Sequence, residues 1–313
     1  MPLARRSALL ACTVAAAALL SACDSIGPPL KDAAYAMERS RAGLARKEIA
    51  LADGTRIVYL EGGHGAPLVL VHGFGADKDN FTRVARYLTP HYRVIALDLV
   101  GFGESTHRDD VDYHYAAQAA RVHDFTQALG LARFDLGGNS MGGGIAMSLA
   151  AQHPQEVASL WLIDCAGIAA APPSELARIV TTTGANPLII AKESDFPAFL
   201  KFVMSDPPYI PGPVMNVMAR ERMANEPLER QVFLQIATDS VDAAVKGLAT
   251  PTLIVWGDED RALAAGTVPV LQALLPNAQA VVMPHVGHAP MIERPQQSAD
   301  DYLRFRDGLA AAR

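Results

Sequence analysis

Short apolar runs alternate with helix-compatible segments along most of this chain of 313 residues. A continuous apolar run of about 4–8 residues is typical of a strand that is buried on both faces. Because such runs recur between helical segments, the pattern predicts a mostly parallel sheet with helices on both faces. The strands are expected at 67–71, 93–97, 157–163, 252–256 and 280–283, with one more before a glycine-rich turn near 138, and helices at 81–88, 115–129 and 145–152.

The pattern changes at two places. Asp53-Gly54 separates two strand-like runs within residues 49–60, and an Asp-Gly pair between such runs is a hairpin signal. Between residues 166 and 249 the alternation stops, and helical segments are interrupted by proline clusters. We therefore expect an antiparallel edge, a core domain of residues 48–165 and 250–313, and a helical lid subdomain at 166–249, after the sixth strand.

The first residues have the layout of an export signal. Arg5 and Arg6 precede an uncharged, Ala- and Leu-rich segment that is short for a membrane span. Leu20-Ser21-Ala22-Cys23 resembles the lipobox of bacterial lipoproteins, in which the cysteine carries the lipid. We predict a signal peptide at 1–22, lipidation of Cys23, and a tether with an outer helix at 23–47. The alternatives are simple secretion and an uncleaved anchor.

Composition narrows the possible functions. The net charge of -6 gives no electrostatic basis for binding nucleic acid. With Cys12 in the signal and Cys23 lipidated, Cys165 has no partner for a disulfide and is expected to be a small buried side chain. No metal or cofactor is expected, and we expect a monomer.

Gly138-Asn139-Ser140-Met141-Gly142 has the form G-x-S-x-G, the nucleophile elbow of serine hydrolases. A serine that attacks a carbonyl must project from a very tight turn between a strand and a helix. Glycines two positions before and after it allow the two backbones to approach each other. The turn precedes a helical segment, and this context supports Ser140 as the nucleophile.

The other catalytic groups are expected in the order Ser, Asp, His. Asp260 follows the strand at 252–256, and His288 follows the strand at 280–283. We predict that His288 takes the serine proton and that Asp260 orients its ring. Asp258, His285 and, more rarely, Asp164 are the rival choices.

An oxyanion hole needs two backbone amides. Met141 directly follows the nucleophile, and Phe74 lies in the loop His72-Gly73-Phe74-Gly75 after the third strand. We predict that these two residues donate the amides. His72 and the loop at 98–105 are expected to be structural.

Several segments together resemble the family V bacterial lipases within the α/β-hydrolase superfamily. They are His72-Gly73-Phe74-Gly75, the segments at 98–105 and 138–143, Phe202-Val203-Met204 with Pro207 to Pro211, and Val286-Gly287-His288. The resemblance covers about residues 52–306. It implies the α/β-hydrolase fold and a triacylglycerol lipase or carboxylesterase that works through an acyl-enzyme without metal or cofactor. Monoacylglycerol lipases are similar around His72 and Ser140.

A lid after the sixth strand would lie over the active site. We therefore expect some of its apolar residues, Phe199, Phe202, Met204 and Tyr209, to line an acyl-chain pocket. Two other functions are considered: a C–C hydrolase of ring-fission products, which shares the segment at 138–143, and a non-catalytic lipoprotein that binds a partner. An exported lipid-ester hydrolase, anchored on the periplasmic side or cell surface, is the function that the sequence favours.

Overall fold

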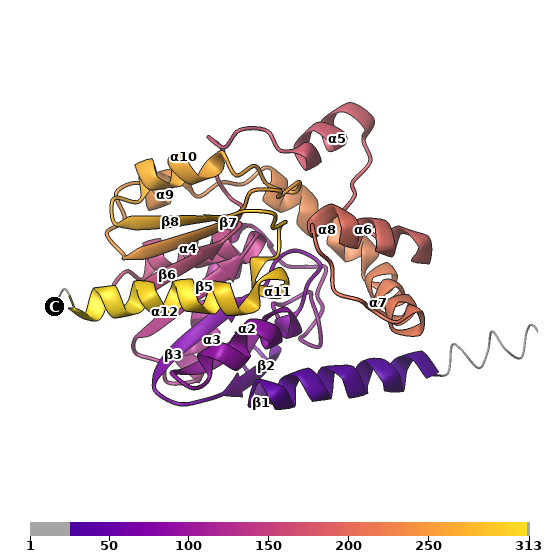
Figure 1. The fold of residues 1–313 in the computed structure, drawn as a ribbon, viewed down its shortest axis with the longest axis horizontal. Coiled ribbons are helices and arrows are strands. Elements are labelled where there is room, and N and C mark those ends of the chain that lie inside the picture. Colours follow the sequence, from indigo (N-terminus) through magenta and orange to yellow (C-terminus); the bar gives the residue numbers. More distant parts are fainter. Residues whose placement is uncertain (1–25, 312–313) are drawn as a thin grey trace, which may run out of the picture.

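The computed structural model describes residues 26–311, and its centre is one eight-stranded sheet (Figure 1). The strand order is β1-β2-β4-β3-β5-β6-β7-β8, in which β2 is antiparallel to both of its neighbours, β1 and β4, and all other neighbouring strands are parallel. This confirms the predicted fold class of a mostly parallel sheet with an antiparallel edge. The strands are β1 (Leu44–Ala50), β2 (Arg56–Gly62), β3 (Ala66–Val71), β4 (Tyr92–Leu97), β5 (Phe134–Asn139), β6 (Val157–Ile163), β7 (Thr252–Gly257) and β8 (Ala278–Met283).

Helices cover both faces because successive strand residues point to opposite sides. Leu68 and Leu70 of β3 pack in one buried cluster, whereas Val69 and Val71 pack in the other. The first cluster lies under α2 (Thr82–Leu88), α11 (Pro290–Glu293) and α12 (Pro295–Ala311). The second lies under α3 (Tyr115–Ala128), α4 (Met141–Gln152), α9 (Asp242–Val245) and α10 (Thr267–Leu274).

The predicted lid segment lies between β6 and β7 and is helical. It contains α5 (Glu175–Thr183), the short 3-10 helix η2 (Glu193–Asp195), α6 (Phe196–Val203), α7 (Gly212–Ala224) and α8 (Glu226–Ala237), followed by α9. Helices α5 to α8 lie together beyond one end of the sheet (Figure 1). That end carries the carboxyl ends of the parallel strands, where ligands bind in such sheets.

The N-terminal boundary differs from the prediction. A helix covers residues 26–41, but β1 already begins at Leu44, so residues 44–47 belong to the sheet and not to the outer helix. Gly43 has φ +64°, a left-handed conformation that ends a helix at little cost for glycine. The predicted signal peptide and Cys23 lie outside the described residues. Within residues 26–311, every helix is too short or too polar to cross a membrane.

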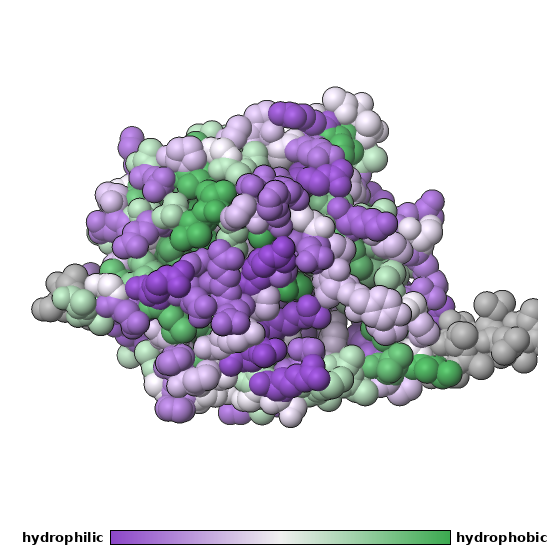
Figure 2. All heavy atoms as spheres, in the orientation of Figure 1, coloured by the Kyte–Doolittle hydropathy of each residue, from purple (hydrophilic) through white to green (hydrophobic). Residues whose placement is uncertain are grey.

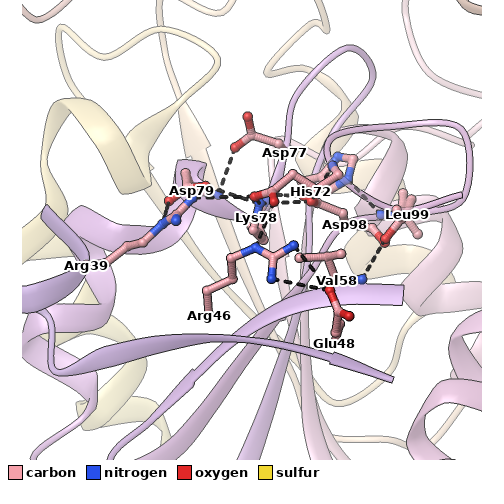
Figure 3. A network of polar contacts seen from close by, with 12 residues as sticks. Arg39, Arg46, Glu48, Val58, His72, Asp77, Lys78, Asp79, Asp98 and Leu99 are labelled. Carbon is pink, nitrogen blue, oxygen red and sulfur yellow. Dashed lines mark hydrogen bonds and ion pairs between the residues drawn. The ribbon is translucent and has the colours of Figure 1, made fainter. Parts of the chain in front are cut away.

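A buried polar network joins the N-terminal helix and hairpin to the loops at the end of the sheet (Figure 3). The side chain of Lys78, in the 3-10 helix η1 (Lys78–Phe81), is only 2% exposed. Its Nζ lies 2.9 Å from Asp98 Oδ2 and 2.8 Å from Glu104 Oε1. Arg39 of the N-terminal helix binds both oxygens of Asp79 at 2.6 Å. The network therefore fixes the loops that follow β3 and β4.

The charges of this network support one another. Burial is the largest single influence on Lys78 and opposes its charge, but the carboxylates of Asp98, Asp79 and Asp77 and the hydrogen bond to Glu104 together raise the pKa of the ammonium group. Burial is likewise the largest single influence on Glu104, yet the hydrogen bonds and charges of Lys78 and Arg46 together lower the pKa of that carboxyl to about 2. Removing one member leaves the others buried and unpaired, which is the costly case for a buried ion pair.

We predict that Lys78→Met lowers the free energy of unfolding by about 3–5 kcal/mol, because Asp98 is left buried without its counter-charge. The matched control is Arg108→Met, which removes the exposed ion pair between Arg108 and Asp110. Urea denaturation should show a large shift of the midpoint for the first variant and little change for the second. Equal midpoints for the two variants would contradict this account.

Candidate active site

Ser140 lies at a strained bend between β5 and α4. Its φ of 55° is unusual for a residue other than glycine, and such strain occurs often at functional sites. The bend is possible because its neighbours lack side chains: a Cβ on Gly138 would lie 2.2 Å from the Gly142 carbonyl oxygen, and one on Gly142 would lie 2.1 Å from that of Val71. The half-buried serine is thus presented at the end of the strand.

His288 and Asp260 meet in a direct hydrogen bond. The Nδ1 atom of His288 lies 2.7 Å from Asp260 Oδ2. The other oxygen of Asp260 accepts the backbone N–H groups of Ala262 and Leu263, at 2.8 and 2.9 Å. Because these bonds hold the carboxylate and Nδ1 donates to it, Nε2 is left as the acceptor nitrogen of the ring. An imidazole in this tautomer can act as a general base.

The elbow itself is tied to the histidine loop. Asn139, directly before Ser140, donates from Nδ2 to the carbonyl oxygens of His288 and Ile163, at 3.2 and 3.1 Å. The backbone N–H of His288 donates in turn to the Val203 carbonyl at 2.7 Å, a contact with the lid. The fold therefore brings together residues that are 149 positions apart. The sequence did not predict these contacts of Asn139 and Val203.

Two of the three rival residues, His285 and Asp258, lie in a turn at the surface. The side chain of His285 is 83% exposed, and its Nδ1 lies 3.1 Å from Glu259. Asp258 accepts the backbone N–H of His285 at 2.7 Å. These residues therefore form a surface turn with one another. Asp164, the third rival, is fully buried beside Asp260.

Two backbone amides lie where an oxyanion hole is expected. Met141 is the first residue of α4, a position where the N–H has no partner within the helix. The loop after β3 approaches the nucleophile closely, since a Cβ on Gly73 would lie 3.0 Å from Ser140 Cβ. Phe74 follows in this loop, and its ring packs edge-on against Phe102. The loop that carries Phe74 therefore lies against Ser140, and Met141 follows Ser140 directly.

His72 has a structural position below this loop. The Leu99 N–H donates to its Nε2 at 3.0 Å, and its Nδ1 lies 2.7 Å from the Gly73 carbonyl oxygen. Complete burial lowers the pKa of His72, so the ring stays neutral and bridges two loops. This agrees with the structural role that the sequence predicted for it.

A lid arginine covers the predicted oxyanion loop and was not anticipated from sequence. A Cβ on Gly75 would lie 2.3 Å from the Arg222 guanidinium, which also stands over the rings of Phe74 and Phe199. Arg222 makes a bidentate ion pair with Glu229, whose side chain is 1% exposed. The lid is thereby packed directly on the loop that carries Phe74.

The four predicted acyl-pocket residues have different environments. Phe202 and Met204 are buried, at 6% and 8% exposure, and Phe199 is half-buried. They belong to the lid, and Phe202 and Met204 help to line a hollow of about 540 Å³. Tyr209 is 90% exposed because the irregular segment between α6 and α7 carries it into solvent, so its ring lines no enclosed pocket here.

This hollow lies beside the catalytic loop and not over Ser140. Its wall is formed by Glu259 and Arg261, on either side of Asp260, with residues of the lid: Lys201, Phe202, Met204, Ser205 and Pro207. The Arg261 guanidinium stands 4.6 Å from the centre of the Phe202 ring. The hollow therefore lies next to the loop that carries Asp260.

Two groups of side chains in the described residues offer several metal-ligand atoms within 4.8 Å of one another. One is Asp164, Asp260 and His288, of which Asp260 and His288 are already bonded to each other. The other is His123, His153 and Glu156, at the far end of α4. The two imidazole rings there stack almost parallel, with centroids 3.7 Å apart. Lone pairs in parallel planes do not converge on one ion, so this arrangement holds no ready-made metal site.

Comparison with known proteins places this geometry in a family. The sequence profile of the alpha/beta hydrolase fold matches residues 66–295. The chain belongs to the α/β-hydrolase family. It is 44% identical to Lipase 1 of Psychrobacter immobilis over 283 residues, which cover 88% of each chain. It is 30% identical to monoacylglycerol lipase abhd6-B of Xenopus laevis, over 79% of this chain and 77% of that protein.

A solved structure gives the same result. The crystal structure of a membrane phospholipase A, described as a bacterial virulence factor, matches with a TM-score of 0.89 and 38% identity, over 97% of this chain and 99% of that one. Together with the lipases, it supports one activity for this α/β-hydrolase. The protein is a carboxylic ester hydrolase that acts on lipid esters.

We predict that Asp260→Asn lowers kcat by about 10⁴-fold, because the amide no longer favours the required tautomer of His288. Asp258→Asn is the matched control, since this carboxylate bonds only within the surface turn. Initial rates on p-nitrophenyl butyrate measure both. If the Asp258 variant lost activity and the Asp260 variant kept it, Asp258 and not Asp260 would be the residue that orients His288.

Proposed function

We propose that Ser140, His288 and Asp260 form the catalytic triad of this lipid-ester hydrolase, with the amides of Phe74 and Met141 as its oxyanion hole. The observation that carries this proposal is the 2.7 Å contact between His288 and Asp260 beside the strained bend at Ser140. A bend alone could be structural, and an imidazole–carboxylate pair alone is common. The bend and the His288–Asp260 pair come together at the carboxyl ends of parallel strands, and this combination supports acyl transfer.

The reaction proceeds in two steps. The Ser140 Oγ–H gives its proton to Nε2 of His288 while Oγ bonds to the ester carbonyl carbon. The carbonyl oxygen becomes negative and accepts hydrogen bonds from the two amides, a stabilisation in which one donor is worth about 10²–10³ in rate. The ester C–O bond then breaks, and His288 returns the proton to the departing alcohol.

Water completes the cycle. It takes the place of the alcohol, gives a proton to Nε2 of His288 and bonds to the acyl carbon. The bond from Ser140 to the acyl group breaks, the proton returns to Oγ, and the fatty acid leaves. Asp260 keeps its charge throughout and stabilises the imidazolium that forms twice in each cycle.

The lid supports an apolar substrate. Phe199, Phe202 and Met204 come from helix α6 and the residue after it, and the carbonyl oxygen of Val203, the last residue of this helix, accepts the N–H of His288. We propose that these side chains contact the acyl chain of the substrate, and that the enzyme is a lipase of the bacterial family V type. A C–C hydrolase is the second candidate, because a hydrolase of 2-hydroxy-6-oxo-6-(2'-aminophenyl)hexa-2,4-dienoic acid from Metapseudomonas resinovorans is 28% identical over 270 residues. The higher identity of the lipases favours esters.

The N-terminus supports attachment to a membrane. We propose that residues 1–22 form a lipoprotein signal and that Cys23 carries the lipid, which places the enzyme on the periplasmic side or the cell surface. Ile26, Leu30 and Met37, on the helix that follows, are 53%, 39% and 49% exposed and share one face at spacings of four and seven. Apolar side chains are visible where this helix leaves the body (Figure 2). Such a face suits contact with lipid.

We predict that wild-type enzyme hydrolyses p-nitrophenyl esters and emulsified triglyceride, with the rate rising as the acyl chain becomes long enough to fill the apolar lid contacts. Phe202→Ser should remove this preference for longer chains while short esters are still cleaved, because the acyl contact is lost together with the packing of Phe202 against Arg261. Rates across a series of acyl lengths measure both. A chain-length profile that is flat in wild type would contradict the acyl pocket, and cleavage of ring-fission diketo acids without ester cleavage would favour the second candidate.

We predict that Cys23→Ser moves the enzyme from the membrane fraction to the soluble fraction, because its lipid anchor is lost. The control is Cys165→Ser, since Cys165 is buried in the folded domain. Incorporation of labelled palmitate in a bacterial host reports the modification directly. Equal labelling of wild type and the Cys23 variant would rule out the anchor at this position.

A further inference from the structure

Asp164 occupies an unusual position between the elbow and the loop of Asp260. It follows β6, is fully buried and has φ 44°, one of three positive values outside glycine among residues 26–311. Its backbone N–H donates to the Val255 carbonyl, and two residues later the Ala166 N–H donates to the Ser140 carbonyl, both at 2.9 Å. Strain in a buried acidic residue at this point indicates a function.

The carboxyl group of Asp164 is only partly satisfied by hydrogen bonds. Its Oδ1 accepts the Gly257 N–H at 2.9 Å, whereas Oδ2 has no partner among the described residues. One oxygen of Asp164, one oxygen of Asp260 and one ring nitrogen of His288 lie within 4.8 Å of one another. Two buried carboxyl groups this close do not both carry a charge, because each disfavours ionisation of the other.

Hydrogen bonding decides which of the two is charged. Asp260 accepts from Ala262, Leu263 and His288, and bonds of this kind favour a carboxylate. Asp164 accepts only one backbone N–H and has no cation beside it. The negative charge therefore belongs to Asp260, and the proton belongs to Asp164.

The other ionisable groups around Asp164 act in the same direction. Burial, followed by the charge of Asp260, raises the pKa of Asp164 well above its usual range. Glu293 of α11 adds a further negative charge. The adjacent Cys165 is also buried, and its raised pKa keeps the thiol neutral. In the described part of the chain, the Gly257 N–H is the group that favours the ionised form of Asp164.

We propose that Asp164 is a positioning residue of the active site: a neutral carboxylic acid whose Oδ2–H donates to Asp260 and holds that carboxylate against His288. This rests on the proposed roles of Asp260 and His288. Oδ2 of Asp164, which otherwise has no partner, then donates a hydrogen bond, and the contact between the two carboxyl groups becomes attractive instead of repulsive. When the pH rises through the raised pKa of Asp164, the proton leaves, the repulsion returns, and Asp260 no longer holds the imidazole ring in place.

The first test compares Asp164→Asn with Asp164→Ala. Asparagine reproduces the neutral acid, because its oxygen can accept from Gly257 while its NH₂ group donates to Asp260. We expect the Asn variant to keep kcat within about twofold of wild type, and the Ala variant to lose about tenfold in kcat with KM unchanged, the effect of one lost hydrogen bond. Similar large losses in both variants would overturn the proposal.

The second test is the pH profile, which a merely structural residue would not change. Wild type should lose kcat/KM at alkaline pH as Asp164 ionises beside Asp260. The Asn variant has no such proton and should keep its activity over that range. An alkaline limb that is identical in both enzymes would overturn the proposal.

The third test does not require activity. Above the ordinary carboxyl pKa of about 3.9 the unfolded chain releases this proton while the folded chain keeps it, so wild-type stability falls as pH rises towards the folded-state pKa. In urea denaturation the stability of the Asn variant relative to wild type should therefore increase as pH rises above about 3.9, until the folded-state pKa of Asp164 is reached. A difference independent of pH would show that Asp164 is ionised. Absence of ester hydrolysis by wild type would instead defeat the proposed function and leave this result intact.

Discussion

The backbone bend at Ser140 depends on the absence of side chains around it. Gly138 and Gly142 let β5, α4 and the end of β3 approach to distances at which a Cβ would collide with a carbonyl oxygen. Gly73 brings the loop after β3 against the serine in the same way. Ser140 and the loop that carries Phe74 thus lie close together because three backbones meet there.

Loops from distant parts of the chain are fixed around this bend by polar contacts. Asn139 binds the carbonyl oxygen of His288, and His72 bridges the loops after β3 and β4. Lys78 holds the same two loops from below through Asp98. From above, Arg222 packs the lid on Phe74. Rigid support on both sides allows backbone amides to be aimed at a developing charge before the reaction starts.

Sequence patterns predicted the fold well because each pattern has a local cause. Buried strands read as apolar runs, the G-x-S-x-G segment requires glycine at fixed positions, and the order of Ser140, Asp260 and His288 follows the order of strands. The contacts of Arg222 and Val203 were missed because they depend on how the lid folds back, and those of Asn139 because they join segments far apart in the sequence. The strand at residues 44–47 was missed because its charged sequence resembles a helix surface. The catalytic roles themselves stay predictions.

The central claim is that one serine, activated by the imidazole of His288, forms a covalent bond with the substrate. Labelling with a fluorophosphonate and peptide mapping by mass spectrometry measures this directly. The account predicts a single phosphonate adduct on the peptide that contains Ser140, and its loss in a His288→Ala variant that still unfolds cooperatively. An adduct on a different residue, or undiminished labelling without His288, would contradict it.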